Sequence, residues 1–406
     1  MKILFFSENF PPETNAAATR VYERALHWVK AGHDVTIITS APNFPLGIVF
    51  AGYKNHWYFN ENVDGINVVR VKTYISQNHG IFRRGLDFLS FGIMSSFFGL
   101  LQSRPDVIAA TSPQFFAAVA GWFVAFVRRL PFVFELGDLW PTSIVAVGAI
   151  KKNCLINLFE QVELFLYRHS TRVAPLTFAF KKNLVDRGID ATKIDVVRNG
   201  VDVSRYQPME QCAKLAIKYN IKNSFVVGYI GTHGMAHGLS NVLKVAKKLK
   251  YEKNIIFLFV GAGADRENLV KLSSDHNLPN TLFLPMQPKE EMRSIWSLCD
   301  IALVHLKNDP AFSEVIPSKI FEAMSMGLPI LLNMPDGEAR NIIEKECAGI
   351  WVPPENPEAL SKSIKMLIED KKLLKKMSQN CVAAAPKYSR SCQAQKMIDV
   401  FDKAIL

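Results

Sequence analysis

Several chemical signatures are absent from this sequence of 406 residues. It contains no D-x-D, no H-E-x-x-H and no cluster of His or Cys, so we expect no metal ion and no other cofactor. G-x-S-x-G and Walker A sequences are also absent, which disfavours hydrolase and kinase chemistry. The six cysteines are widely spaced and include no C-x-x-C pair. Their spacing argues against a disulfide framework or a zinc site and favours a reducing compartment.

Hydrophobic runs long enough to cross a membrane are missing as well. The two apolar segments, 86–101 and 115–127, are each shorter than the roughly 20 residues of a spanning helix. Arginine pairs flank them, at 83–84 before the first and at 128–129 after the second. An apolar face beside arginines favours a helix in a membrane interface. The alternative is a helix buried against a sheet, and it fits the second segment better. The opening apolar run of four residues is too short for a signal peptide and predicts a first strand.

The charge is positive but not concentrated. The net charge is +11, and the basic excess is spread over both halves of the chain. Nucleic acid would favour a local basic patch interleaved with aromatic residues, which the sequence does not show. An anionic membrane surface or a polyanionic substrate explains the excess at least as well.

Strand and helix patterns alternate along the whole chain, which predicts parallel sheets built from βαβ units. The strands expected in the first half are 2–6, 34–39, 68–71, 107–110, 132–135, 172–174 and 194–197. Those expected in the second half are 225–230, 255–260, 282–284, 301–304, 330–332 and 349–352. The pattern predicts two doubly wound α/β domains, 1–200 and 201–387, with ligands at the carboxyl ends of the strands. The last segment, 388–406, is expected to cross back to the first domain.

A pair of glutamates in the second half gives the most specific functional signal. Glu314 precedes a helix start at Pro317 and Ser318, and Glu322 lies one turn inside that helix, which Gly327 closes. The free N–H groups and the positive end of the helix dipole suit a phosphate. The two carboxylates can accept hydrogen bonds from sugar hydroxyls, so the segment fits a nucleotide-sugar. The alternative is that Glu322 caps its helix and Glu314 is a solvated loop residue.

Other candidates for the same ligand lie nearby in the second half. Lys319 follows the helix start and is well placed to neutralise a diphosphate. A glycine-rich turn after strand 225–230 could cradle phosphate, with His233 and His237 as donors, although lone histidines could merely satisfy their own loop. The loop at Met286 has a backbone that could pair with a base, or it is an ordinary connection.

Two candidates lie in the first half. Ala16 and Ala17 are small residues just before a helix, and they allow either close approach of a ligand or close packing of the helix on the sheet. Asp138 follows strand 132–135 in the run Glu-Leu-Gly-Asp-Leu-Trp-Pro, where doubly wound folds place functional groups. Asp138 can orient a hydroxyl or act as a base, and the alternative is an N-cap or turn carboxylate.

Together these motifs resemble the retaining, two-domain glycosyltransferases of family 4, which have the GT-B fold. Glu314 and Glu322 match the E-x7-E motif of that family. The resemblance extends over nearly the whole chain, from Phe-Pro-Pro-Glu near the start through Asp-Leu-Trp-Pro and Arg-Asn-Gly-Val-Asp. It implies two Rossmann-like domains facing across a cleft, with a C-terminal helix that crosses back to the first domain.

The resemblance also implies residue roles in donor binding. Glu314 would contact the donor sugar and Glu322 the ribose, whereas Met286 would lie near the base. Ser318 and Lys319 would lie at the diphosphate.

One departure from the family pattern concerns the phosphate cradle. Many members carry an Arg/Lys pair after the first strand of the second domain, where this chain has Thr232 and His237. Either Lys319 and backbone amides carry the phosphate charge, or the cradle is built differently. Asp138 would stand where the family often has a His or Asp facing the donor sugar and the acceptor.

The resemblance is greatest to enzymes of bacterial surface polysaccharide assembly, such as N-acetyl-fucosamine transferases. It implies transfer of an N-acetylated amino sugar from a UDP-sugar to a lipid-diphosphate-linked acceptor, as in O-antigen or capsule biosynthesis. The implied partners are the donor, the lipid-linked acceptor and the inner membrane surface, without nucleic acid, for a peripheral protein on the cytoplasmic face. The alternatives are a nucleotide-sugar 2-epimerase and a non-catalytic partner that binds nucleotide-sugar or lipid.

Overall fold

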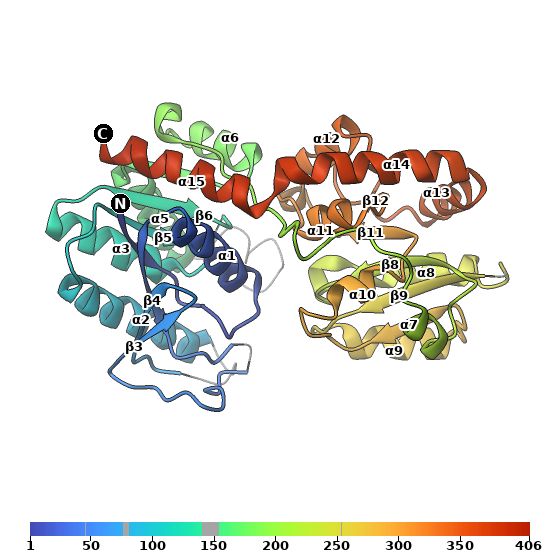
Figure 1. Ribbon diagram of the computed structural model, residues 1–406, viewed down its shortest axis with the longest axis horizontal. Helices are drawn as coiled ribbons and strands as arrows, with labels where there is room; N and C mark the ends of the chain where they lie inside the picture. The colour runs from blue at the N-terminus through green and yellow to red at the C-terminus, as the bar shows by residue number, and fades with distance from the viewer. Residues whose placement is uncertain (45, 76–80, 140–153, 253) are drawn as a thin grey trace. The chain divides into compact units, whose positions relative to one another are not determined.

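The computed structural model describes residues 1–44, 46–75, 81–139, 154–252 and 254–406. These residues form two compact units (Figure 1). The first unit comprises Met1–Asn199 together with Arg390–Leu406, and the second comprises Gly200–Ser389. Each unit contains one largely parallel sheet with helices on both faces, which confirms the α/β fold class predicted from the alternating pattern.

The first unit is built on a seven-stranded sheet in the order β3-β4-β2-β1-β5-β6-β7. Its strands are β1 (Lys2–Phe6), β2 (Asp34–Ser40), β3 (Tyr58–Val63), β4 (Ile66–Val71), β5 (Val107–Thr111), β6 (Phe132–Leu136) and β7 (Arg172–Pro175). Neighbouring strands are parallel except at the edge, where β3 pairs antiparallel with β4. The central strands β1, β5 and β6 are almost wholly buried, as expected for a parallel sheet covered on both faces.

Helices cover both faces of this sheet. They are α1 (Ala16–Lys30), α2 (Ile81–Leu101), α3 (Phe115–Arg128), α5 (Cys154–His169), α6 (Phe178–Asp186) and α15 (Arg390–Ile405). On one face α1 and α15 lie side by side (Figure 1). Trp28 Nε1 of α1 donates to Ala394 O of α15 at 3.1 Å, and the ring centres of Trp28 and Phe401 are 5.3 Å apart. The last helix of the chain therefore completes the core of the first unit.

The second unit is built on a six-stranded, all-parallel sheet in the order β10-β9-β8-β11-β12-β13. Its strands are β8 (Phe225–Ile230), β9 (Ile255–Val260), β10 (Thr281–Leu284), β11 (Ile301–His305), β12 (Ile330–Asn333) and β13 (Gly349–Val352). Its helices are α7 (Ala213–Lys218), α8 (Ser240–Lys248), α9 (Arg266–Asp275), α10 (Met292–Trp296), α11 (Lys319–Met326), α12 (Glu338–Lys345), α13 (Pro357–Glu369) and α14 (Lys371–Ala384). Because β8 lies at the centre, the loops after β8, β9 and β11 leave the sheet side by side.

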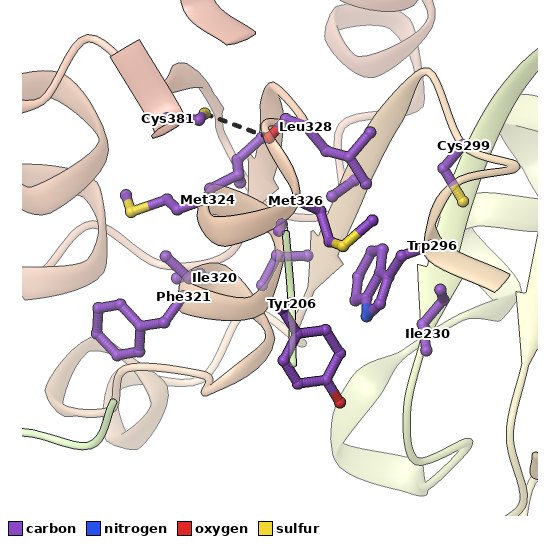
Figure 2. Close-up of a cluster of buried hydrophobic side chains, with 14 of the residues drawn as sticks. Tyr206, Ile230, Trp296, Cys299, Ile320, Phe321, Met324, Met326, Leu328 and Cys381 are labelled. Carbon is purple, nitrogen blue, oxygen red and sulfur yellow. Dashed lines mark hydrogen bonds between the residues drawn. The ribbon is translucent and has the colours of Figure 1, made fainter. Parts of the chain in front are cut away.

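The short helix α11 is held rigidly by its apolar face. Ile320, Phe321 and Met324 are fully buried in the core drawn in Figure 2. Cys381 of α14 donates from Sγ to Leu328 O at 3.3 Å, just beyond the helix. Gly327 ends α11 in the left-handed region, at φ 72°, where glycine is favoured. The first turn of α11 is thereby fixed against the sheet.

One expected strand is absent from the sheet, and one strand of the sheet was not expected. The segment 194–197 makes a single bridge, Ile194 to Val173, and is not a strand of the sheet. The edge strand β3 was not anticipated, because three consecutive polar residues, 60–62, interrupt it and three consecutive aromatics, Trp57, Tyr58 and Phe59, are exposed. A half-solvated edge strand has no continuous apolar run to mark it.

The apolar segments 86–101 and 115–127 form the helices α2 and α3. Both pack on the sheet through glycines: a Cβ atom at Gly99 would lie 2.7 Å from the Phe6 ring, and one at Gly121 would lie 2.9 Å from the Phe132 ring. Among the described residues no helix has the length and hydropathy required of a membrane span.

Candidate functional site

A glycine-lined turn follows the central strand β8. Gly231 has φ 137°, and a Cβ atom there would lie 2.9 Å from Lys319 Nζ. Gly261, after β9, has φ 147°, and a Cβ atom there would collide with Gly231 O. Only glycine fits these close approaches in the left-handed region. The strand ends and the first residue of α11 are consequently packed together.

Lys319 reaches from α11 into this region. Its Nζ lies 3.7 Å from the centre of the Tyr229 ring and has no hydrogen-bond partner among the described residues. Burial lowers the pKa of Lys319 to about 7, although nearby Glu322 acts in the opposite direction. Lys319 therefore carries a buried amine that makes no hydrogen bond to any described residue.

Two of the predicted histidines lie around the same tyrosine. The ring centres of His233 and His237 are 5.8 Å and 6.0 Å from that of Tyr229. His233 is fully buried, and both of its ring nitrogens lack partners within the described part of the chain, as does Nδ1 of His237. Burial, aided by the charges of Arg266 and Lys319, lowers the pKa of His233 to about 4. Burial and Lys319 lower the pKa of His237 to about 3.

A third histidine, His305, was missed by sequence reasoning. It ends β11, the neighbour of β8, and is 1% exposed. Its Nδ1 lies 2.6 Å from His237 O, whereas Nε2 is buried without a partner, and burial lowers the pKa of His305 to about 4. The available signal was its place at the carboxyl end of a strand, since adjacent parallel strands bring their ends together.

The two glutamates of the E-x7-E motif lie on either side of the start of α11. Glu322 is in its first turn, and Trp296 Nε1 donates to Glu322 Oε2 at 3.4 Å. Glu314 ends the 3-10 helix Pro310–Glu314 and is half-buried. The hydroxyl of Ser318, the residue before α11, makes no capping hydrogen bond. The carbonyl of Ser313 packs against Gly337, where a Cβ atom would collide with it, and this contact fixes the loop that carries Glu314.

The remaining predicted donor residues of the second unit are more exposed. Thr232 is exposed, and its backbone carbonyl accepts a hydrogen bond from the Tyr229 hydroxyl at 2.8 Å. Met286 follows β10 and is 59% exposed. The structure therefore brings His233, His237 and Lys319 together around Tyr229. Thr232 joins this group through its backbone, whereas Met286 lies in the separate loop after the edge strand β10.

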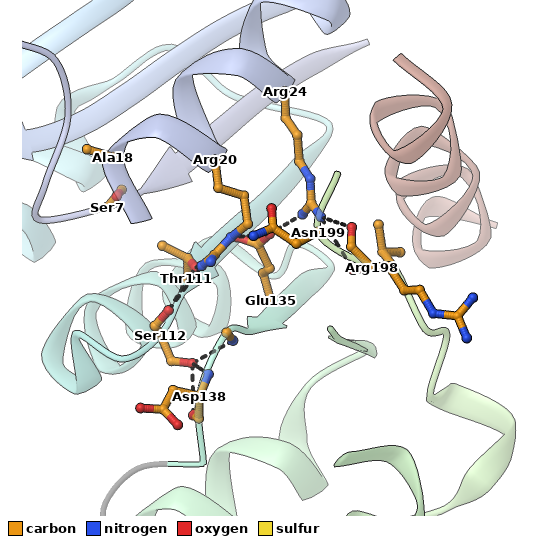
Figure 3. Close-up of polar contacts among 12 residues, drawn as sticks. Ser7, Ala18, Arg20, Arg24, Thr111, Ser112, Glu135, Asp138, Arg198 and Asn199 are labelled. Carbon is orange, nitrogen blue, oxygen red and sulfur yellow. Dashed lines mark hydrogen bonds and ion pairs between the residues drawn. The ribbon is translucent and has the colours of Figure 1, made fainter. Parts of the chain in front are cut away.

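In the first unit a buried ion network lies at the carboxyl end of β6 (Figure 3). Glu135 forms ion pairs with Arg20, at 3.2 Å, and with Arg24, both from α1. Arg20 also donates to Thr111 Oγ1 at 2.9 Å. Burial by itself would raise the pKa of Glu135, but the two arginines outweigh it and leave that pKa lowered. A Cβ atom at Gly137 would lie 2.5 Å from Arg20 Nη2, so glycine is required there.

Asp138 follows this network directly. The Ser112 hydroxyl accepts from Gly137 N at 2.9 Å and lies 3.3 Å from both the N and the O of Asp138 (Figure 3). The backbone of Asp138 is therefore fixed at the carboxyl end of β6, and its side chain is half-buried. The neighbouring Trp140 and Pro141 of the predicted motif lie outside the described residues.

The two alanines differ from each other. α1 begins at Ala16, with Asn15 as its cap, whose side chain accepts from Ala18 N at 2.8 Å. Ala16 is exposed, whereas Ala17 is 8% exposed and packs in the core.

Within the described residues no group of three or more His, Cys, Asp or Glu is arranged to hold a metal ion.

Two doubly wound units with functional groups at their strand ends have the architecture of a GT-B glycosyltransferase. Two family models match the chain: "Glycosyl transferase 4-like domain" over residues 15–200 and "Glycosyl transferases group 1" over residues 213–382. Between them they cover most of both units. The chain belongs to the family 4 glycosyltransferases of the GT-B fold.

Individual relatives are distant but span most of the chain. WcaI of Escherichia coli K12, which bears the name of a colanic acid biosynthesis glycosyl transferase, is 25% identical over 386 residues, 91% of this chain and 92% of its own. An Escherichia coli UDP-Gal:alpha-D-GlcNAc-diphosphoundecaprenol alpha-1,3-galactosyltransferase is 26% identical over 246 residues, 58% of this chain and 61% of its own. The crystal structure of Anabaena Alr3699/HepE in complex with UDP matches with a TM-score of 0.75 at 18% identity, over 99% of this chain and 100% of that one.

Proposed function

We propose that this glycosyltransferase moves a sugar, an N-acetylated amino sugar, from a UDP-sugar to a lipid-diphosphate-linked acceptor in bacterial surface polysaccharide biosynthesis. The observation that carries the proposal is the group of unpartnered basic nitrogens of His233, His237 and Lys319 beside the start of α11. Buried nitrogens without partners indicate a ligand site, and the Lys319 amine among them favours an anion there. The E-x7-E glutamates on either side add acceptors for hydroxyls. A diphosphate between a ribose and a sugar has both features.

The comparisons support each partner in this proposal. HepE has been crystallised with UDP and with UDP-glucose, which supports a uridine diphosphate donor. The galactosyltransferase relative is named for an acceptor on diphosphoundecaprenol, which supports a lipid-linked acceptor. The names of WcaI and of AmsK, an amylovoran biosynthesis glycosyltransferase of Erwinia amylovora, support a role in surface polysaccharide assembly. The N-acetylated sugar rests on the resemblance of the sequence motifs alone.

We assign the donor to the second unit and give its residues separate tasks. Lys319 and Ser318, with their own backbone N–H groups, face the diphosphate, and His233 and His237 complete its surroundings. Glu314 accepts from the donor sugar and Glu322 from the ribose. In this assignment protein groups neutralise the diphosphate, and the transfer requires no metal ion.

The proposed reaction is same-face displacement with retention. The bond between the anomeric carbon and the β-phosphate oxygen breaks, and the acceptor oxygen bonds to the same face of that carbon. The acceptor proton passes to the departing phosphate oxygen, while Asp138 orients the acceptor hydroxyl. Lys319 and the helix-end amides stabilise the charge on the departing diphosphate, an effect that contributes roughly 3–4 kcal/mol per well-placed donor.

We also propose that the first unit rests on the inner face of the cell membrane. One side of α2 exposes a continuous apolar stripe: Leu86, Leu89, Ile93, Phe97 and Leu101. The exposed aromatics of β3 lie alongside, since the Tyr58 and Phe98 rings pack at 5.2 Å. Arg83 and Arg104 flank the stripe and are exposed, which suits anionic headgroups.

A flotation assay tests the membrane proposal. Protein should float with vesicles that contain phosphatidylglycerol and cardiolipin, and much less with phosphatidylcholine alone. Replacing both Ile93 and Phe97 by Glu should abolish flotation, because two charges would enter the apolar stripe. Equal flotation of this variant and the parent protein would refute the proposal.

A transfer assay tests the activity itself. Purified protein is incubated with UDP-sugars, including UDP-N-acetylamino sugars, with and without a bacterial lipid extract. Transfer of label to lipid supports the proposal. Conversion of the donor without any acceptor would instead identify a 2-epimerase, and binding without turnover would identify a non-catalytic partner.

A further inference from the structure

Five buried imidazole and lysine nitrogen atoms in the second unit have no hydrogen-bond partner among the described residues: Nδ1 and Nε2 of His233, Nδ1 of His237, Nε2 of His305 and Nζ of Lys319. We call these four side chains the base cluster. Buried polar atoms without partners are uncommon in proteins, and each carries a desolvation cost. Lys319, His233 and His237 surround one ring, that of Tyr229, which indicates that their partner is a ligand that offers acceptor atoms to the Lys319 amine.

The surroundings of Lys319 determine which charge state its amine holds. On its own helix Glu322 lies one turn on, and its carboxylate accepts from the Trp296 indole. From β8 the face of the Tyr229 ring covers Nζ, and the following turn brings His233 and His237 to the same ring. His305 of β11 lies against His237, with Nδ1 2.6 Å from His237 O. No carboxylate among the described residues forms an ion pair with Nζ.

Charged groups farther out act mainly on the histidines. Asp265 and Arg266, at the start of α9, affect His233 in opposite directions, and Glu355 favours the charged form of His305. Lys307 contributes its aliphatic stem, which would meet a Cβ atom at Gly238 at 3.0 Å. The cluster therefore contains four bases and no acid of its own.

These contacts favour neutral side chains while no ligand is bound. Burial lowers the pKa of Lys319 to about 7, so the amine is largely uncharged in mildly alkaline solution. The electron-rich face of the Tyr229 ring and the charge of Glu322 both favour the ammonium form, but burial outweighs them. Burial likewise keeps all three histidines neutral near pH 7, with each pKa lowered to about 4 or below.

We propose that the diphosphate of the donor binds to this cluster together with a proton, which Lys319 takes up from solution. The inference rests on the proposed function, because it assumes that the anion is a nucleotide-sugar diphosphate. An opposite charge within a few ångströms stabilises the ammonium form and raises the pKa of the amine in the complex. The balanced step joins a neutral amine, one proton and a dianion to give an ammonium–diphosphate pair.

The sign of the pH dependence follows from this step. Below the pKa of the free protein the amine is already charged, so donor affinity is constant there. Above that pKa each pH unit costs up to tenfold in affinity, until the pH passes the higher pKa of the complex. The donor phosphates add no titration of their own, because the ionisation of phosphate near pH 6 belongs to a terminal phosphate and both donor phosphates are esterified.

Isothermal titration calorimetry with UDP-glucose tests the proposal. Titrations at pH 6, 8 and 9 in buffers of different ionisation enthalpy count the protons taken up on binding. With a free pKa of about 7 for Lys319, we expect uptake of about 0.9 proton at pH 8 and about 0.1 at pH 6. The dissociation constant should rise roughly tenfold between pH 8 and pH 9. Binding at pH 8 without proton uptake would overturn the inference and leave the proposed function intact.

Two variants assign the proton to Lys319. Lys319→Arg keeps a positive charge at every pH used, so it should bind without proton uptake and with an affinity that is flat between pH 7 and pH 9. Lys307→Met removes a half-buried lysine beside the same turn and should leave the uptake unchanged. Persistent uptake by a folded Lys319→Arg protein would refute the role of Lys319. If this variant does not fold, the proton count of the parent protein still decides whether the donor binds together with a proton.

A second ligand separates failure of the inference from failure of the proposed function. UDP has a terminal phosphate that is fully ionised at pH 8 and above, so uptake measured there again reports the protein. If UDP alone binds and takes up a proton at pH 8, the inference holds and only the choice of sugar changes. If neither UDP nor UDP-glucose binds at any pH, the proposed function is wrong and the inference falls with it.

Discussion

Both units bury charged or basic side chains at their strand ends, but they differ in whether these side chains are paired with opposite charges. In the first unit Glu135 lies between Arg20 and Arg24, and Arg390 of α15 pairs with Glu23 at 2.8 Å. In the second unit the base cluster holds five buried nitrogen atoms that make no hydrogen bond to any described residue. The first arrangement pairs its buried charges with opposite charges, although Glu135 Oε2 and Arg24 Nε make no hydrogen bond, whereas the second gains an opposite charge only when an anion is present.

This difference separates scaffold from binding site. Removing one partner of a buried ion pair strongly lowers the free energy of unfolding of the protein, because the other charge stays buried alone. An unpartnered buried base already carries that cost in the ligand-free protein, so its removal should spare the fold and weaken ligand binding. The contrast predicts that mutations in the first network change stability and that mutations in the base cluster change affinity.

The largest effect is expected from Glu135→Ala. It leaves two arginines buried without their shared carboxylate, so the free energy of unfolding should fall by about 3–5 kcal/mol. Urea unfolding followed by fluorescence measures the change. Asp186→Ala, which removes an exposed carboxylate paired with Lys182, should change stability by about 0.5 kcal/mol or less. Equal stability of Glu135→Ala and the parent protein would remove the basis of the comparison.

Asp138→Ala should act on turnover instead of stability. Ser112 fixes the backbone of Asp138 independently of the carboxylate, so the loop keeps its conformation. If the carboxylate orients the acceptor hydroxyl, kcat should fall roughly a hundredfold while UDP-glucose affinity is unchanged. Steady-state kinetics with lipid acceptor and calorimetry with donor measure the two quantities. A parallel loss of donor affinity would contradict the assignment of Asp138 to the acceptor.

Much of this organisation was predictable because each signal was local. The β8 run Phe225–Ile230 is a continuous apolar stretch, and the start of α11 at Pro317-Ser318 and its end at Gly327 were read from helix-start and helix-stop residues. The E-x7-E spacing fixed Glu314 and Glu322 to the two sides of one helix start.

The missed features depend on contacts between distant segments. His305 has no motif around it and becomes a site residue only because β11 pairs with β8. Arg20 and Arg24 look like solvated helix residues, yet they meet Glu135, which is more than one hundred residues away in sequence. Sequence patterns record periodicity along one segment, whereas strand order decides which segment ends meet.

Lys319→Met tests the prediction that mutations in the base cluster change ligand affinity and not stability. The variant removes the buried amine and keeps its apolar stem, so stability should be unchanged or higher. UDP-glucose affinity should fall by about 2 kcal/mol, roughly thirtyfold, because a charge-assisted contact with phosphate is lost. Lys307→Met serves as the matched control and should retain affinity. A large loss of stability in Lys319→Met would show that the amine supports the fold and is not reserved for a ligand.

Glu322→Ala should give the smallest effect and the most specific one. Its carboxylate already accepts from Trp296, so a ribose hydroxyl would use remaining lone pairs, and its loss should weaken UDP-glucose binding by about 1–1.5 kcal/mol, roughly tenfold. Glu322→Gln keeps an acceptor oxygen and should lose less.

Deoxy analogues of the donor decide whether Glu322 contacts the ribose. The parent protein should bind UDP-glucose more tightly than its 2′-deoxy or 3′-deoxy analogue, whereas Glu322→Ala should bind UDP-glucose and that analogue equally, because the hydroxyl has lost its acceptor. Such a cycle isolates one contact from the effect of the substitution on α11 itself. If Glu322→Ala discriminates between these ligands as strongly as the parent protein does, Glu322 serves only to hold Trp296 and belongs with the scaffold.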